Sequence, residues 1–443
     1  MRERARRLRS AWLAALVLLG GTAGCKAKPS PAEWLYGRLL PDWQAFRAQN
    51  GEVKDGGAAR AMFRGASAWP TLSEDLRHID EAWPDDKQTA ELVAALNQHA
   101  QLAGLPFWVD AQNVQARPIL LTYKIRQRAQ WKLAPPALAS VEVLQVLRLD
   151  SLNIAMGLIG QLNAERPLVL LDRVEGSIVD DLSRAYEKPQ PADEIEVAAL
   201  EQFRRILESR VGGDRLQAVA LKVAARDRLF RSMLGKLKTS LIAPDRFVWG
   251  DAWFETVRPL TKFDRPGGPV VFASDLREVE AADRALDNPG TREVVTQLVS
   301  FLAEQVEAHE IRHAFETQPL PIPAQLREQF REEDQIMDMA EAELRAYLGE
   351  MHDSSAPPCL TVLQLLRQTF GARARPTPHF FAGHAMFRVL ASPAKQAPVD
   401  LMHHLCALPD TQAREQAAQA WKKLYGVDLR PAVRIPTPTT AQP

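Results

Sequence analysis

The stretch NPGTREVVTQLVSFLAEQVEAHEIRHAFE, residues 288–316, has apolar residues recurring at steps of three and four, the spacing of one face of a helix. Asn288 is a suitable N-cap, and Pro289 takes the first helical position, where its missing N–H costs nothing. Three prolines follow between residues 319 and 323, so we expect the helix to end near Glu316. The stretch therefore predicts one long, capped amphipathic helix.

The helix carries the pentapeptide His309-Glu310-Ile311-Arg312-His313. Two histidines four residues apart lie on one face of a helix, one turn from each other, so both imidazoles can reach a single zinc ion. Glu310 is placed to hold and deprotonate a water on that ion. Catalytic zinc takes three protein ligands and keeps one position open for water, so a third ligand is needed.

A second predicted helix, residues 325–350, offers that ligand. The arrangement resembles the gluzincin metallopeptidases, in which the third ligand is a glutamate on a helix after the motif helix. Glu343, with Ala346 three residues on, is similar to the Glu-x-x-Ala-Asp/Asn/Tyr segment of several such families. The resemblance covers residues 289–350 and implies that Glu343 is a zinc ligand in a peptide hydrolase. Glu341 points to another face and is held in reserve.

Other acidic and histidine residues are weaker candidates for roles at the same site. Asp334 and Asp338, one helical turn apart, suit an aspartate-liganded variant of the motif. A further donor normally stabilises the oxyanion that forms during amide hydrolysis. The candidates for it are His379, His384 and Tyr347, of which we select His384, at the start of a predicted helix over residues 380–391.

Two features depart from the gluzincin pattern. Motif helices of these families usually have uncharged residues beside the histidines, whereas here Glu307 and Arg312 are charged. We expect Arg312 to face solvent or to pair with Glu316, four residues later. Tyr347 stands where an aspartate usually follows the third ligand, and it can donate a hydrogen bond near the site or simply pack.

The N-terminus predicts export. Residues 2–9 include five arginines, residues 11–19 are apolar, and residues 20–24 are small, as in a secretory signal. The apolar run is too short to span a bilayer as a helix. The run Thr22-Ala23-Gly24-Cys25 resembles the bacterial lipobox, although that motif usually has leucine in place of Thr22. The resemblance implies cleavage before Cys25, a lipid on its thiol, and anchoring to the periplasmic or surface face of an envelope membrane. An ordinary signal peptide with an incidental cysteine is the alternative.

Composition limits the class of partner. The chain has 443 residues, 46% of them hydrophobic and 25% charged, and its formal net charge is zero. These values are typical of a globular protein, and the absence of a basic excess argues against nucleic acid as a partner. Beyond the lipobox the chain contains Cys359 and Cys406, which either form one disulfide or remain two buried thiols.

The predicted fold is mainly α with a minor α+β part, a helical catalytic region like that of the zincins preceded by a small mixed sheet. Alternating apolar residues at 121–126 and 140–149, and an apolar run at 167–171, predict strands. Residues 188–192, rich in proline, form the clearest linker. The predicted segments are the signal peptide (1–24), a tether (25–34), an N-terminal α+β region (35–190), a mostly helical metallopeptidase-like region (191–430) and a disordered tail (431–443).

The leading interpretation is a membrane-anchored, zinc-dependent hydrolase of peptide or protein substrates, with Glu310 and His384 as catalytic residues and His309, His313 and Glu343 as ligands. The sequence predicts no cofactor besides zinc. A second interpretation is a non-catalytic envelope lipoprotein whose helical body binds a partner. A third is a zinc amidase that acts on cell-wall material.

Overall fold

The computed structural model describes residues 86–435 apart from 103, 115–116, 135–139, 150–159, 164–165, 187–192, 316–319, 331–334, 373, 392–396 and most of 238–270. The predicted signal peptide, Cys25 and the tether lie outside the described residues. The described chain is mainly helical with a small mixed sheet, as predicted.

The sheet has the order β1-β2-β3-β5-β4, and β6 pairs with β2 beyond the end of β1. β3 and β5 are parallel, and the other paired strands are antiparallel. The strands are β1 (Phe107–Val114), β2 (Arg117–Leu133), β3 (Ser140–Arg148), β4 (Gly160–Asn163), β5 (Arg166–Leu170) and β6 (Ala432–Ile435).

Strand β2 contributes buried side chains to the apolar clusters on both faces of the sheet. In its first half Leu121, Tyr123 and Ile125 are buried in one apolar cluster, as alternation requires. The register with β3 shifts between Ile125 and Gln127, and a one-residue shift of this kind sends later side chains to the opposite face. Trp131 therefore belongs to the other cluster, the main core between the sheet and the helices.

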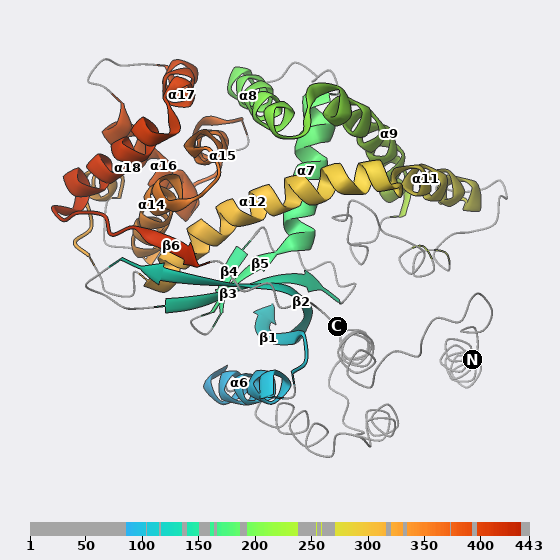
Figure 1. Cartoon of the computed structure of the whole chain (residues 1–443), viewed down its shortest axis with the longest axis horizontal. Coiled ribbons are helices and arrows are strands. Elements are labelled where there is room, and N and C mark those ends of the chain that lie inside the picture. Colours follow the sequence, from blue (N-terminus) through green and yellow to red (C-terminus); the bar gives the residue numbers. More distant parts are fainter. Residues whose placement is uncertain are drawn as a thin grey trace.

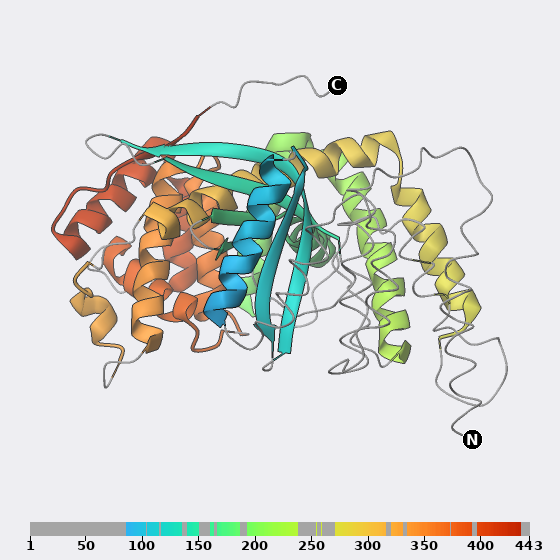
Figure 2. The same ribbon diagram turned by 90° about the horizontal axis from the view of Figure 1, so that it is seen from below.

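Helix α12 crosses one face of the sheet, and α6 lies on the other side (Figure 1). Helices α14 to α18 gather around the C-terminal end of α12, while α9 and α11 lie at its N-terminal end, an arrangement also visible from below (Figure 2). The helices are α6 (Asp86–Leu102), α7 (Leu171–Tyr186), α8 (Glu194–Val211), α9 (Gly213–Leu237), α11 (Ala273–Leu286), α12 (Pro289–Phe315), α13 (Ala324–Arg327), α14 (Gln335–Asp353), α15 (Pro358–Phe370), α16 (Pro378–Leu390), α17 (Pro398–Ala407) and α18 (Asp410–Tyr425).

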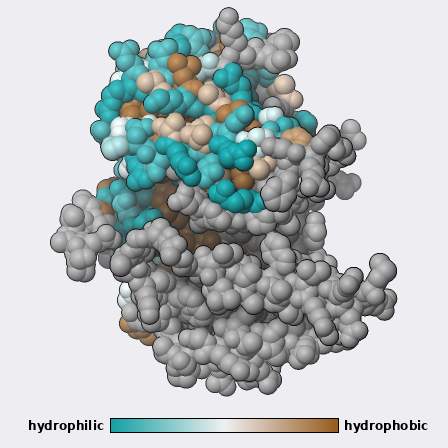
Figure 3. All heavy atoms as spheres, turned by 90° about the vertical axis from the view of Figure 1, so that its right-hand side faces the viewer, coloured by the Kyte–Doolittle hydropathy of each residue, from teal (hydrophilic) through white to brown (hydrophobic). Residues whose placement is uncertain are grey.

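The main core buries side chains from the sheet, α7, α8, α9, α12 and α14 to α18 in one continuous cluster. It thus draws on residues from both sides of the predicted boundary at residue 190, and the division into two regions stays a prediction. At the α9–α11 end, the described surface is mostly hydrophilic with scattered apolar residues (Figure 3). None of the described helices has both the length and the apolar composition needed to cross a membrane.

The structure corrects two boundaries and answers one open question. The tail was predicted to be disordered from residue 431, but Ala432–Ile435 form β6 because the free edge of β2 accepts them as a strand. The helix predicted over residues 325–350 is instead the short α13 followed by α14. Cys359 and Cys406 form a disulfide that joins α15 to α17.

Candidate metal centre

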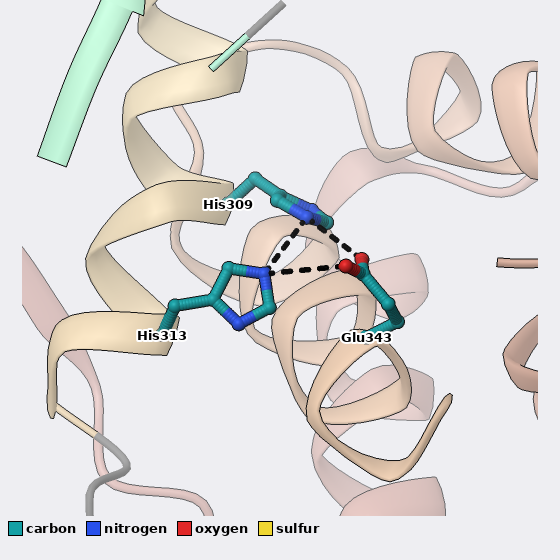
Figure 4. Close-up of side chains that lie close together, drawn as sticks. All are labelled: His309, His313 and Glu343. Carbon is teal, nitrogen blue, oxygen red and sulfur yellow. Dashed lines mark hydrogen bonds and ion pairs between the residues drawn. The ribbon is translucent and has the colours of Figure 1, made fainter. Parts of the chain in front are cut away.

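Helix α12 presents the two motif histidines on one face. Its first turn is capped as predicted, because the Asn288 Oδ1 accepts a hydrogen bond from the Thr291 N–H at 3.0 Å. The helix runs unbroken to Phe315, so His309 and His313 lie on its last turns. Helix α14 packs alongside and directs Glu343 at both imidazoles (Figure 4).

The three predicted ligands converge. The Nε2 atoms of His309 and His313 are 3.3 Å apart, and they lie 3.2 and 3.7 Å from the Glu343 carboxylate oxygens. One ligand atom from each residue lies within 4.8 Å of those of the other two. Two imidazole nitrogens and one carboxylate oxygen form a donor set that can hold a metal ion.

Protonation within the cluster follows from burial and mutual contact. Burial lowers the pKa of His309, but hydrogen bonds to Glu343 and Glu350 outweigh it and raise this pKa well above its usual value. Burial, with the neighbouring His309 charge, lowers the pKa of His313 to about 4. Burial raises the pKa of Glu343, but the hydrogen bonds from His309 and His379 hold it well below its usual value. The imidazoles of His309 and His379 thus stabilise the ionised form of the Glu343 carboxylate.

Glu310, the predicted base, is buried beside the ligands. Burial raises the pKa of its carboxyl to about 7, with Glu343 and Glu350 adding to the rise and His309 opposing it. A carboxyl whose pKa lies near neutrality can both accept and release a proton, as a general acid–base group must.

The three candidates for the oxyanion donor, His379, Tyr347 and His384, have different surroundings in the structure. His379, in the first turn of α16, places its Nδ1 3.0 Å from Glu343 and 3.1 Å from the Tyr347 hydroxyl. Tyr347 is fully buried and donates to the Gln368 side chain at 3.0 Å. His384, favoured from the sequence, instead packs its ring against two phenylalanines of the neighbouring apolar surface. His379 thus contacts the cluster directly.

The rival ligands that the structure describes, Asp338 and Glu341, are not part of the cluster. Asp338 is exposed on α14, and Asp334 lies outside the described residues. Glu341 is buried and forms an ion pair with Arg345 at 2.8 Å.

The charged residues beside the histidines point into the protein. Arg312 was expected at the surface, but it is fully buried, forms an ion pair with Asp353 and donates to the Arg430 carbonyl oxygen at 2.8 Å. The expectation was wrong because α12 is enclosed by the sheet, α14 and the C-terminal segment, which leaves this position no route to solvent. Glu316, its expected partner, lies outside the described residues.

Glu307, like Arg312, is buried and makes polar contacts, in this case on the side of α12 that faces the sheet. Its carboxylate accepts hydrogen bonds from Trp131 at 3.2 Å and Gln145 at 2.6 Å, and it pairs with Arg434 of β6 at 2.9 Å. Helix α12 is therefore held by polar contacts on both sides of the histidines.

Glu350 is a residue of this site that was not predicted from the sequence. Its Oε2 lies 2.9 Å from the His309 Nδ1 atom. The only sequence signal for this contact is its place seven residues, or two helical turns, after Glu343.

No protein-family model, curated protein or solved structure matches this chain. The interpretation of the centre therefore depends on its own geometry and chemistry.

Proposed function

We propose that this chain is a zinc-dependent hydrolase of peptide bonds, with His309, His313 and Glu343 as the zinc ligands. The observation that supports it most directly is the convergence of these three side chains, from α12 and α14, on one point. Two histidines and one carboxylate are the ligand set of several catalytic zinc sites, and they leave a position open for water. The resemblance of residues 289–350 to the gluzincins agrees with this set.

Each neighbouring residue has a defined task in this proposal. Zinc supplies Lewis acidity, which polarises a carbonyl oxygen and makes water more acidic. Glu310 removes a proton from the attacking water and delivers it to the leaving amine, so that one water is consumed per bond broken. His379, rather than His384, donates to the oxyanion, because its ring lies beside Glu343 and is partly exposed.

The proposed location follows from the N-terminal sequence. The signal-like segment and the lipobox-like run ending at Cys25 favour a lipoprotein anchored to the bacterial envelope. Its substrates are then peptides or proteins exposed on that side of the membrane.

Metal analysis and a peptide-hydrolysis assay test the proposal together. We expect about one zinc per purified chain, and loss of that zinc in the variant with His309→Ala and His313→Ala. Glu310→Gln should keep the zinc and lose hydrolysis. Glu341→Gln is the matched control, since it removes a buried carboxylate on α14 outside the cluster.

Three outcomes would refute this assignment: purified protein without zinc, unchanged zinc in the double histidine variant, or full hydrolysis by Glu310→Gln. A protein that binds zinc but cleaves cell-wall material and not peptides would shift the proposal to the amidase class. Absence of both zinc and hydrolysis would favour the non-catalytic, partner-binding lipoprotein.

A further inference from the structure

Glu350 is a buried carboxylate at the junction of three helices. Its side chain, on α14, is 2% exposed. Its Oε1 accepts hydrogen bonds from the Gln305 amide of α12 at 2.6 Å and from the Thr361 hydroxyl of α15 at 2.7 Å. Its Oε2 lies 2.9 Å from the His309 Nδ1 atom. Neighbours on two other helices, α12 and α15, thus fix the orientation of this carboxylate.

The charge of Glu350 requires a cation nearby. Burying a carboxylate is costly unless hydrogen bonds and an opposite charge compensate for lost hydration. Gln305 and Thr361 are neutral, and the ion-pair partner of Glu350 among the described residues is His309. An imidazole carries positive charge when it is protonated, or shares that of a metal ion bound at its other nitrogen.

Each ring nitrogen of His309 faces a carboxylate, with Glu350 at Nδ1 and Glu343 at Nε2. When Nε2 serves as a ligand it carries no proton, and the Glu350 carboxylate then keeps the proton on Nδ1, so that the Nε2 lone pair is directed at the point where His313 and Glu343 converge. Tyr347 packs edge-on against the same ring, with 4.7 Å between ring centroids, and limits its rotation.

We propose that Glu350 is a positioning residue of the metal centre, which fixes the tautomer and orientation of His309 and strengthens it as a ligand. This inference rests on the proposed metal site, and it adds a residue that does not touch the metal. Gln305 and Thr361 act one step further out, because they hold Glu350 in place.

Zinc affinity and the visible spectrum of the cobalt(II)-substituted protein test this role. Glu350→Gln removes the charge and turns an N–H₂ group toward existing donors. We expect a 10- to 100-fold weaker zinc affinity, measured by competition with a chromophoric chelator. The cobalt absorption bands should shift, because they report ligand geometry, which a loss of stability alone does not change.

Two further variants make the test decisive. Thr361→Val removes one donor to Glu350 but keeps its charge, and should weaken zinc binding about threefold or more. The control Glu341→Gln loses a buried glutamate of the same helix and should leave zinc affinity and the cobalt spectrum unchanged. Thermal unfolding of each metal-free variant checks that it is folded.

The outcomes separate this inference from the proposed function. Wild-type protein that binds no zinc would overturn both. Wild-type protein that binds zinc, with unchanged affinity and cobalt spectrum in Glu350→Gln, would overturn only the role of Glu350. If Glu350→Gln does not fold, Thr361→Val decides: unchanged affinity and spectrum refute the role, and weakened binding with shifted bands supports it.

Discussion

The buried ion pair between Arg312 and Asp353 gives the sharpest test of how α12 is held. The Arg312 side chain is 0% exposed and that of Asp353 is 1% exposed. Replacing Arg312 with methionine keeps most of the apolar stem but removes the guanidinium. Asp353 then keeps His352 as a partner at 2.7 Å but loses its arginine, and the Arg430 carbonyl oxygen loses a donor.

The expected cost of Arg312→Met is about 3–5 kcal/mol in the free energy of unfolding, the range for breaking a buried ion pair by removing one partner. Asp353→Leu alone should cost a similar amount, because it leaves the guanidinium buried without its carboxylate. The double variant replaces both charges by apolar groups, which is often nearly neutral, so we expect it to cost about 2 kcal/mol or less. Urea unfolding of the metal-free proteins measures all four corners of this cycle.

The opposite result is equally well defined. An arginine at the surface, paired with a glutamate four residues later, contributes about 0.5 kcal/mol or less. A loss below about 1 kcal/mol in Arg312→Met, or single losses that simply add in the double variant, would refute the burial of this pair. It would restore the solvent-facing orientation expected from the sequence.

Three further predictions concern packing, cross-linking and charge. Gly349→Ala should cost about 1–3 kcal/mol, because the added Cβ overlaps the Arg312 side chain where α12 and α14 approach; an unchanged urea midpoint would contradict this. Replacing Cys359 and Cys406 with serine opens a loop of 47 residues and should cost about 4 kcal/mol by the chain-entropy relation, while reductant should affect only the parent protein. Burial raises the pKa of Asp181 in the folded protein above its ordinary value of 3.8. The stability that this carboxyl contributes is therefore fully present below pH 3.8 and is lost as the pH rises through the raised pKa. The stability of the parent protein relative to Asp181→Asn should accordingly fall as the pH rises above about 4, and a constant difference would count against the shift.

Local signals predicted the part of the site that lies on one helix. The Asn288 cap and the prolines after residue 318 bound α12 correctly, because both act through nearby backbone groups. Once that helix exists, its periodicity alone puts His309 and His313 on one face. The proximity of Glu343 was predicted from the gluzincin resemblance, and the structure confirms it.

Contacts that depend on how two helices pack against each other could not be predicted from local sequence patterns. His379 and His384 are five residues apart on α16, about 140° around the helix axis, and their sequence does not tell which of them faces α14. The contact of Glu350 with His309 spans 41 residues and depends on how α12 and α14 cross. A carboxylate two turns after a ligand has no local signature of its own.

Arg312 shows why a charged position within the motif was placed wrongly from the sequence. Periodicity identifies an apolar face, but it treats every polar residue as a candidate for solvent. Helix α12 has neighbours on several sides, so Glu307 and Arg312 meet partners where a surface helix would meet water. An apolar interface tolerates small rotations of a helix, whereas a buried ion pair loses its compensation when its geometry changes.

Glu307 and Arg312 both contact the C-terminal segment of the chain. The Arg430 carbonyl oxygen accepts a hydrogen bond from Arg312, and Arg434 of β6 pairs with Glu307, so a stretch of five residues contacts the helix that carries both histidines on both sides of its axis. The backbone of β6 is in turn fixed to β2 by its strand pairing. The segment expected to be a disordered tail from residue 431 therefore begins with a strand whose Arg434 contacts α12 at Glu307, two residues before His309.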